Sequence, residues 1–479
     1  MNTKQFYIDG QWVNPAQAND LAVTNPSTEA TVATISLGSQ ADVNAAVAAA
    51  KAAFPAWAAM PLAQRLSYLD KLLAIYLERA EDMAQAISQE MGAPIALARA
   101  AQVAAGAGHL KNAIRAAKSF AFEQPLGAHA PSTMILREPI GVCALITPWN
   151  WPMNQVMLKV APALAVGCTL VLKPSELSPM SSLLLAEYAE AAGLPAGVFN
   201  LVNGDGATVG AALTQHPDVD MVSFTGSTRA GTAISIAAAP TVKRVSLELG
   251  GKGANLVFAD ADEKAVTRGV RHCFNNSGQS CNAPTRMLVE RSAYDAAVAT
   301  ATKVAQQTTV DLAAEEGRHI GPVVSETQFN KIQALIQKGI DEGARLVAGG
   351  LGRPEGMNSG WFVQPTVFAD VTPEMTIWRE EIFGPVLVMA PFDDETHAIT
   401  MANDTPYGLT NYVQTQDAER VRRVSRQLRS GMVEVNGESL GSGSPFGGYK
   451  QSGNGRESGV WGLEEYLETK AVSAWQAPA

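Results

Sequence analysis

A regular alternation of apolar runs and helical patterns between residues 141 and 249 constrains the fold more than any other feature of this chain. Five nearly continuous apolar runs are expected to be strands: Gly141–Thr147, Thr169–Lys173, Val198–Val202, Met221–Thr225 and Val245–Leu249. Helical spacing separates them at 153–166, 180–192, 206–213 and 228–238. This pattern predicts a parallel, doubly wound sheet. Ligands on such a sheet bind at the carboxyl ends of the strands.

The alternation starts again after Gly250–Gly251 and predicts a second α/β domain. Expected helices include 262–274, 325–340 and 417–428. The expected strands are Asn255–Phe258, Met287–Val289, Leu346–Ala348, Pro385–Met389, Asn411–Val413 and Met432–Val435. The Gly- and Ser-rich segment 441–459 is expected to be a loop, because much of its backbone needs permissive dihedrals.

The remaining segments predict short strands and turns over 1–40, then helices from Ala41 to about Ser119 with a break at 91–94. Residues 125–138 are expected to be irregular to extended. The N-terminus is polar and lacks the apolar core of a signal peptide, and no uninterrupted apolar stretch reaches about 18 residues. We therefore expect a cytoplasmic protein with no membrane partner.

The charge and the cysteine content of the chain argue against two classes of protein, those that bind nucleic acids and those built on disulfides. The formal net charge is −10 and no basic run is present, which argues against a nucleic-acid partner. Four cysteines in 479 residues, none in a CxxC pair, do not form a disulfide framework and favour a reducing compartment.

Polar turns follow four of the five strands, where a doubly wound sheet holds its ligand. They are TPWNWP at 147–152, KPSE at 173–176, NGDG at 203–206 and TGS at 225–227. The KPSE turn offers a cation for phosphate or hydroxyl groups and a carboxylate for ribose. Gly226 and Ser227 open a helix, whose N-terminus favours phosphate. The usual dinucleotide fingerprint is absent. Each turn alone fits ordinary turn chemistry, but four along one sheet edge favour a cofactor site.

Cys281 is the candidate nucleophile. It follows the polar segment NNSGQS at 275–280, so we expect it outside the core, where its thiolate could attack an aldehyde carbon. Cys143, Cys168 and Cys273 lie in apolar or helical surroundings and are expected to be inert packing. No histidine adjoins Cys281, so a Cys–His pair has no local support. From this segment alone, a loop cysteine without a role stays equally open.

Two acidic segments are further candidates. Glu248 ends a strand in ELGGK at 248–252 and is either paired and half-solvated or functional. In EEIFGP at 380–385, Glu380 and Glu381 could bind hydroxyls and Phe383 could hold a flat ring, although a solvated loop is the simpler interpretation. The six histidines lack a metal-ligand spacing such as HExxH, so we predict no metal site.

Together these motifs resemble the aldehyde dehydrogenase superfamily over nearly the whole chain. Each motif is modestly specific, but eight of them in the family's order and spacing leave little room for chance. The matching segments are FYIDG at 6–10, TPWNWP at 147–152, KPSE at 173–176, FTGST at 224–228, ELGGK at 248–252, GQSC at 278–281, EEIFGP at 380–385 and PFGGYKQSGNGRE at 445–457.

The resemblance implies a role for each matched catalytic residue. Cys281 aligns with the nucleophile and Glu248 with the base that activates water for deacylation. Asn150 aligns with the side-chain donor of the oxyanion hole, which it shares with the backbone N–H of Cys281. Lys159 and Glu457 match positions linked to proton relay or active-site support.

The resemblance also implies cofactor and substrate contacts. Lys173 and Glu176 align with ligands of the adenosine ribose, Ser227 with the pyrophosphate contact, Glu381 with the nicotinamide-ribose ligand and Phe383 with its apolar neighbour. Expected to complete the cofactor site are Thr147, Pro148, Trp149, Ser175, Gly206, Gly226 and Leu249. Trp151, Ser280 and Asn282 are expected in the substrate pocket.

Three domains are implied: an NAD-binding domain of residues 1–119 and 141–250, a catalytic domain of residues 251–450, and a β oligomerisation arm of residues 120–140 and 460–479. Homodimers and homotetramers are both usual in the family.

The implied reaction oxidises an aldehyde to the carboxylic acid with NAD(P). It passes through a thiohemiacetal and a thioester on Cys281, hydrolysed by water that Glu248 deprotonates. Glu176 can accept a hydrogen bond from a ribose 2′-OH and would repel a 2′-phosphate, so NAD is expected over NADP. Residues 437–444 are small and polar and contain no arginine, which suggests a roomy pocket for aromatic or medium-chain aldehydes.

Three other hypotheses remain open. A CoA-acylating semialdehyde dehydrogenase would share the fold, but a base for water such as Glu248 competes with CoA transfer. A non-catalytic binding or structural protein on the same scaffold would not need the set of Cys281, Glu248 and Asn150. A thiol hydrolase would need neither KPSE nor EEIFGP.

Overall fold

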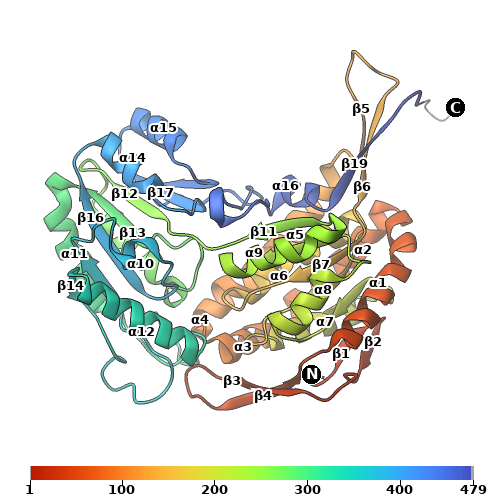
Figure 1. Cartoon of the computed structure of the whole chain (residues 1–479), viewed down its shortest axis with the longest axis horizontal. Helices are drawn as coiled ribbons and strands as arrows, with labels where there is room; N and C mark the ends of the chain where they lie inside the picture. Colours follow the sequence, from red (N-terminus) through yellow and green to blue (C-terminus); the bar gives the residue numbers. More distant parts are fainter. Residues whose placement is uncertain (1, 476–479) are drawn as a thin grey trace.

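The computed structural model describes residues 2–475, in which two seven-stranded sheets form two α/β lobes side by side (Figure 1). The first sheet has the order β11-β10-β7-β8-β9-β1-β2. Its strands are β11 (Arg244–Glu248), β10 (Met221–Thr225), β7 (Val142–Ile146), β8 (Thr169–Lys173), β9 (Phe199–Leu201), β1 (Phe6–Ile8) and β2 (Gln11–Val13). The five strands predicted from the alternation are parallel, and the N-terminal strands add an antiparallel edge. The chain leaves β7 in one direction and returns to β10 on its other side, which creates a topological switch point.

Helices cover both faces of the first sheet because the side chains of each strand alternate between two cores. In β7, Cys143 and Leu145 join one core, while Val142, Ala144 and Ile146 join the other. The first core is covered by α2 (Leu62–Glu78), α3 (Ala80–Met91), α5 (Val103–Ser119), α6 (Pro152–Val166) and α7 (Met180–Ala191). The second is covered by α1 (Gln40–Ala59), α8 (Ala211–Gln215) and α9 (Thr228–Ala238).

The second sheet has the order β14-β15-β16-β13-β12-β17-β18 and is parallel except for β14. Its strands are β12 (Ala254–Val257), β13 (Arg286–Glu290), β14 (Arg345–Ala348), β15 (Thr366–Ala369), β16 (Val386–Phe392), β17 (Thr410–Gln414) and β18 (Met432–Val435). Its faces are covered by α10 (Ala265–Phe274) and α11 (Tyr294–Gln307) on one side, and α12 (Glu326–Asp341), α13 (Thr376–Arg379), α14 (Glu395–Asn403) and α15 (Ala418–Gln427) on the other. The sequence pattern did not single out β15, a four-residue strand.

The helical segment over 40–119 is interrupted twice. The predicted break at 91–94 is confirmed, because Gly92 ends α3 with a left-handed φ of 82°. A second break, between α1 and α2, falls at Met60, since the residue before a proline avoids the helical region. Among residues 2–475, no single helix is both long and apolar enough to cross a membrane. Only α1 and α2 taken together meet both conditions, and they are bent by 119° to each other.

Two smaller sheets complete the fold. β3 (Asp20–Thr24) and β4 (Thr31–Ser36) form a separate hairpin. β5 (Glu123–Pro125), β6 (Met134–Pro139) and β19 (Leu467–Val472) form a three-stranded antiparallel arm that projects from the first lobe (Figure 1). Residues 476–479 of the predicted arm lie outside the described part of the chain.

Candidate active site

The site lies where the carboxyl edge of the first sheet meets the amino edge of the second. Residues 147–150, 225–227 and 248–250 follow β7, β10 and β11, whereas 251–253, 281–285 and 380–385 precede β12, β13 and β16. A Cβ at Gly251 would lie 2.3 Å from the Cys281 carbonyl oxygen, and one at Gly250 would lie 2.5 Å from Glu381 Oε2. Glycines in ELGGK therefore allow the two edges to approach this closely.

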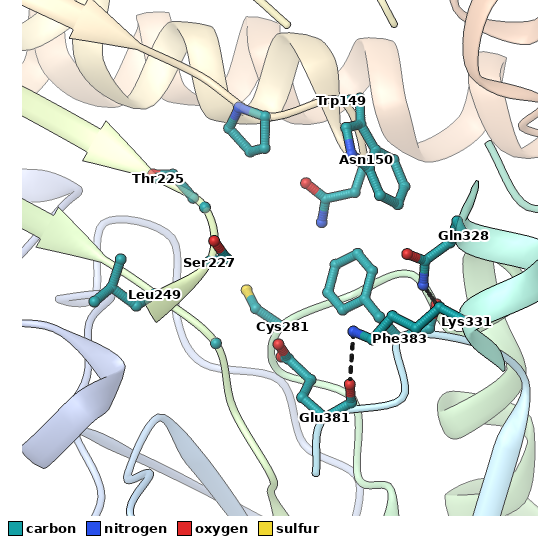
Figure 2. A pocket seen from close by; sticks show the side chains of 13 residues that line it. Trp149, Asn150, Thr225, Ser227, Leu249, Cys281, Gln328, Lys331, Glu381 and Phe383 are labelled. Carbon is teal, nitrogen blue, oxygen red and sulfur yellow. Dashed lines mark hydrogen bonds between the residues drawn. The ribbon is translucent and has the colours of Figure 1, made fainter. Parts of the chain in front are cut away.

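A cavity of about 220 Å³ opens between these edges (Figure 2). Nine of the residues predicted for the site line it: Pro148, Trp149, Asn150, Gly226, Ser227, Leu249, Cys281, Glu381 and Phe383. Thr225, Gly250, Gln328 and Lys331 complete the lining. In Figure 2, Cys281 and Asn150 point into the same space from the second and first lobes.

An unusual backbone places Cys281. Asn276, Ser277 and Gly278 have φ of 52°, 56° and 72°, the left-handed region that only glycine adopts without strain. A Cβ at Gly278 would lie 2.0 Å from the Gly384 carbonyl oxygen, so glycine is required there. As predicted, Cys281 is partly exposed, whereas Cys143, Cys168 and Cys273 are buried.

Asn150 is held by a network from three segments. Its side-chain Nδ2 donates to the Gln279 carbonyl oxygen at 3.0 Å. Its own carbonyl oxygen accepts from Asn276 Nδ2 at 2.9 Å and from Gln102 Nε2 at 3.3 Å. Because an amide NH₂ carries two hydrogens, one remains available to a ligand in the cavity.

Glu248, Lys159 and Glu457 form a buried charged cluster. Lys159 Nζ donates to Glu457 Oε1 at 2.6 Å and to Ser223 Oγ at 3.2 Å. Neither Glu248 oxygen has a hydrogen-bond partner in the described part of the chain. Burial and then the Glu457 charge raise the pKa of Glu248 well above its usual range, while Lys159 lowers it. A Cβ at Gly447 would lie 2.6 Å from Glu248 Oε1, so glycine keeps that space open.

The thiol of Cys281 lies in an electronegative, desolvated setting. Burial raises its pKa, and the carboxylates of Glu381 and Glu248 raise it further. A thiol in this setting holds its proton more tightly than an exposed cysteine does, so attack through the thiolate needs a nearby proton acceptor. Neither oxygen of the buried Glu248 side chain has a hydrogen-bond partner within residues 2–475, so its ionised form could accept that proton.

The other end of the cavity presents aromatic rings and a fixed carboxylate. Trp149 and Phe383 make an edge-to-face contact, with ring centroids 5.5 Å apart. Phe383 has a φ of 60°, and its carbonyl oxygen accepts a 2.9 Å hydrogen bond from Gln328 Nε2. Glu381 Oε1 accepts from the Gly251 backbone N–H at 2.8 Å, and Lys331 Nζ donates to the Glu381 carbonyl oxygen at 3.1 Å (Figure 2).

The residues expected at the adenosine end do not line this cavity. Thr147 begins the turn after β7, and its N–H donates to the Lys173 carbonyl oxygen at 3.1 Å, which ties together the ends of two strands. Lys173 Nζ donates to the Pro174 carbonyl oxygen at 2.9 Å and lies 3.6 Å from Glu176 Oε2. Ser175 Oγ accepts from the Leu177 N–H at 3.2 Å. These residues continue the same sheet edge away from Cys281.

Two glycine turns differ in what they offer a phosphate. Ser227 caps the eleven-residue helix α9 by accepting from the Ala230 N–H, as expected for a helix opened by this turn. Gly206 instead begins a five-residue π-helical turn (Gly206–Gly210) before α8. A Cβ at Gly206 would meet no atom within 4 Å, so no close contact within the chain requires glycine there.

A second, larger cavity of about 560 Å³, here named the entry chamber, is lined in part by residues close in sequence to Asn150 and Gly447. Asn154 lies one helical turn after Asn150, and Phe446 precedes Gly447. The lining contains no charged residue: Ala105, Gly108, His109, Asn112, Asn154, Leu158, Met432, Ser439, Leu440, Gly441, Ser442, Gly443, Ser444, Pro445, Phe446 and Ser458. The predicted pocket residues Trp151, Ser280 and Asn282 line neither cavity. Trp151 Nε1 donates to Ser280 Oγ at 2.8 Å, and the Asn282 carbonyl oxygen accepts from Tyr412 Oη.

Comparison with known proteins agrees with this geometry. The model of the aldehyde dehydrogenase family matches residues 12–472. The chain belongs to the aldehyde dehydrogenase family. A 3-succinoylsemialdehyde-pyridine dehydrogenase from a Pseudomonas species is 53% identical over 475 residues, which are 99% of both chains. The enzyme oxidises an aldehyde to the carboxylic acid, as the motifs predicted.

Solved aldehyde dehydrogenases share the whole fold. The enzyme from Bartonella henselae superposes with a TM-score of 0.98 at 58% identity, covering 99% of each chain. A cysteine-to-alanine mutant of aldehyde dehydrogenase C from Pseudomonas syringae, in complex with NAD+ and octanal, gives 0.97 at 50% identity, covering 100% of this chain and 98% of the other. The predicted architecture of two α/β lobes and a β arm is confirmed.

The structure adds residues to the dehydrogenase site that the sequence did not indicate. Gln328 and Lys331 lie one turn apart on α12, far from any family motif. Gln102 reaches Asn150 and Asn276 from the end of a π-helical segment (Ala98–Gln102). Only the tertiary fold reveals these contacts. For Gln102, the one signal in the sequence is a polar side chain within an apolar helical pattern.

Proposed function

We propose that Cys281, Glu248 and Asn150 carry the catalytic steps of this aldehyde dehydrogenase. Their shared position at the junction of the two sheet edges is the observation that supports the proposal most directly. Cys281 sulfur forms a bond to the aldehyde carbon, and its proton passes to Glu248. The carbonyl oxygen gains negative charge, which Asn150 Nδ2 and the Cys281 backbone N–H stabilise by roughly 3–4 kcal/mol per donor.

The cavity fits a nicotinamide cofactor by the chemistry of its lining. Thr225 Oγ1 is buried beside the cavity and has no hydrogen-bond partner within residues 2–475. The Trp149 and Phe383 rings provide apolar surfaces. The Gly251 N–H donates to Glu381 Oε1, which leaves Oε2 for a ligand. A nicotinamide bound there would supply the acceptor for the hydride of the aldehyde carbon. Glu381 and Phe383 would hold its ribose side, and Ser227 lies at the helix N-terminus expected to face pyrophosphate.

Hydrolysis completes the cycle. The thiol proton first leaves Glu248 for solvent, so that the base is ionised again. A water molecule then adds to the thioester carbon as Glu248 removes one of its protons. The carbon–sulfur bond breaks to release the carboxylic acid, and Glu248 returns its proton to the Cys281 thiolate. Burial raises the pKa of Glu248, so its carboxylate is a stronger proton acceptor than that of an exposed glutamate, which suits both steps. Lys159 and Glu457 set that affinity without touching the substrate.

The decisive experiment separates acylation from deacylation. Glu248→Gln should slow steady-state turnover more than the rapid burst of NADH, because hydrolysis depends fully on the base. Cys281→Ala should abolish both. Rapid-quench kinetics that show equal losses of burst and steady-state rate in Glu248→Gln would contradict the assignment of Glu248 to deacylation.

We infer NAD rather than NADP as the preferred cofactor from the KPSE turn. The Glu176 carboxylate lies 3.6 Å from Lys173 Nζ, is about one-third exposed and remains free to meet a ribose 2′-OH. A 2′-phosphate would face this negative charge. Glu176→Gln should raise kcat/KM for NADP relative to NAD, with Glu187→Gln as a distant control. A wild-type enzyme that uses NADP at least as well as NAD would refute the preference.

For the substrate, we propose uncharged aldehydes of medium size. No lining residue of the entry chamber is a cation. The Arg115 side chain beside it is engaged with Asn112 Oδ1 at 2.8 Å and the Ser442 carbonyl oxygen at 3.1 Å. About 560 Å³ suits a medium-length chain or a single ring. The pyridine semialdehyde and octanal in the names of the relatives agree with this class. A kcat/KM panel over aliphatic, aromatic and carboxylate-bearing aldehydes tests it, and product analysis with and without CoA excludes the acylating alternative.

Three further assignments remain proposals. We propose the NAD-binding domain at 1–119 and 141–250, the catalytic domain at 251–450 and the oligomerisation arm at 120–140 and 460–479. The antiparallel arm offers edge strands for pairing in a homodimer or homotetramer. The unpaired thiols agree with a cytoplasmic location. Light scattering after size-exclusion chromatography decides the oligomeric state.

A further inference from the structure

A third cavity of about 560 Å³ shares no lining residue with the catalytic cavity or the entry chamber. Its walls come from the segment between α3 and α5, the end of α10 and the end of α11 together with residues 317–320. The wall near α3 contains the short helix α4 (Ile95–Leu97) and the π-helical segment that follows it. Such π-helical segments occur frequently at functional sites.

The lining combines an apolar surface with unpaired cations. Pro94, Leu97, Phe274, Val304 and Ile320 supply the apolar part. Arg271 and Arg318 also line the cavity, are exposed, and form no ion pair or hydrogen bond through their side chains within residues 2–475.

The acidic groups beside Arg318 do not neutralise it. Glu316, two residues earlier, is paired with Arg99, which also binds Glu81 at 2.8 Å. The side chains of Asn275 and Gln307 likewise form no hydrogen bond within residues 2–475, and they add neutral donors to the same lining. Two free guanidinium groups beside an apolar surface match an anion that carries an apolar body.

We propose that this cavity is a second binding site for small organic carboxylates with an apolar body, the class to which the product of the reaction belongs. The planar guanidinium fork of arginine matches a carboxylate, and the apolar walls would cover the alkyl or aryl part of the ligand. The proposal goes beyond the catalytic function and does not depend on the roles assigned to Cys281 or Glu248.

Both walls of the cavity continue directly into the network that holds Asn150. On one side, Phe274 and Asn275 precede Asn276, whose Nδ2 donates to the Asn150 carbonyl oxygen at 2.9 Å. On the other side, Ala100 lies two residues before Gln102, whose Nε2 donates to the same oxygen at 3.3 Å. A ligand between the walls contacts Asn275 and Ala100, which lie one and two residues before the two supports of Asn150, so we expect its binding to lower kcat rather than to compete with the aldehyde.

The test compares octanoate with octanol and inorganic phosphate on the full-length enzyme. Calorimetry should show two octanoate sites on the wild type, one of them at the active site, and only the active-site one on the double variant Arg271→Met/Arg318→Met. Loss of the charge-assisted contacts weakens the second site by about tenfold or more. The control Arg422→Met/Arg426→Met removes two exposed arginines of α15 and should bind as the wild type does.

Kinetics provide the second measurement. Octanoate should lower kcat of the wild type. In the double variant, octanoate should inhibit only by competing with the aldehyde. Without octanoate, the kcat of the double variant should equal that of the wild type. The proposal is overturned if the double variant binds octanoate as the wild type does, if inhibition of the wild type is purely competitive, or if octanol or phosphate binds as tightly as octanoate. Activity of the uninhibited enzyme tests the catalytic roles separately.

Discussion

Lys159 Nζ and Glu457 Oε1 lie 2.6 Å apart in an ion pair whose side chains are only 1% and 6% exposed. Both charges act on Glu248: the Glu457 carboxylate raises the pKa of Glu248, and the Lys159 ammonium lowers it. The Lys159–Glu457 ion pair therefore places one positive and one negative charge near Glu248, the proposed base, which must be ionised to act. Removing one partner at a time should reveal this arrangement in the pH dependence of catalysis.

The first prediction concerns the acid limb of the kcat–pH profile. In the proposed mechanism the ionised form of Glu248 is the active base, so activity should rise as pH passes its pKa. Glu457→Gln removes a negative neighbour, lowers the pKa of Glu248 and moves the limb to lower pH. Lys159→Met removes a positive neighbour, raises that pKa and moves the limb to higher pH. Steady-state profiles between pH 5 and 10 check both directions, and shifts of the same sign would contradict the electrostatic role.

Both variants leave a buried charge unpaired, which costs about 3–5 kcal/mol of folding free energy. Circular dichroism and denaturation curves therefore accompany the profiles. The double variant Lys159→Met/Glu457→Gln removes both charges and should recover stability relative to either single change, which separates the effect on folding from the effect on Glu248.

The second prediction tests the network around Asn150. Asn150→Ala removes one oxyanion donor and should lower kcat by about 10²–10³-fold with little change in aldehyde binding. Gln102→Ala removes the hydrogen bonds to the Asn150 carbonyl oxygen and to Asn276 but no oxyanion donor, so it should cause a smaller loss in the same parameter. Stopped-flow measurement of the NADH burst checks both. An effect of Gln102→Ala confined to KM would show that Gln102 does not position Asn150.

The contrast between Asn150 and Gln102 shows how far the sequence can predict this protein. The five parallel strands and the partly exposed Cys281 followed from local sequence patterns, since each depends on residues close in the chain. The switch point did not, because it depends on the order of the strands in the sheet. The roles of Gln102, Asn276 and Lys331 were not predicted either, because their partners lie on other elements. The strand β15 and the break at Met60 were also missed, and for the break a single proline gave too little context.

The third prediction concerns the size of the aldehyde. Gly108 lies inside α5 on the wall of the entry chamber, and a Cβ added there would meet no atom within 4 Å. Gly108→Leu should fill part of the chamber and lower kcat/KM for octanal and pyridine aldehydes by roughly tenfold while sparing propanal. Gly108→Ala is the matched control, since it adds only a methyl group and favours the helix by about 0.5–1 kcal/mol. A uniform loss over all aldehydes would show that the chamber does not admit the substrate.

The last prediction concerns stability rather than chemistry. Glu90 on α3 is buried, and its carboxylate accepts from the backbone N–H groups of Met180 and Ser181 at the start of α7. Burial raises the pKa of Glu90 from 4.5 to about 8, against the hydrogen bonds, which lower it. Between these two values the folded protein keeps a proton that the unfolded chain has released. The stabilising contribution of this proton is therefore present below about pH 4.5 and is lost progressively as the pH rises toward 8, at up to about 1.4 kcal/mol per pH unit.

Glu90→Gln removes this titration while its amide oxygen can still accept from the Met180 N–H. The variant should match the wild type near pH 4.5 and become increasingly more stable than it as the pH rises to 8. Urea unfolding at intervals across that range measures the difference, with the exposed Glu78→Gln as the matched control. Every carboxyl group whose pKa differs between the folded and unfolded states adds to the pH dependence of the unfolding free energy. Only the difference between Glu90→Gln and the wild type therefore isolates the contribution of Glu90. Parallel stability profiles for these two proteins would show that Glu90 is ionised in the folded state throughout, its charge stabilised fully by the N-terminus of α7.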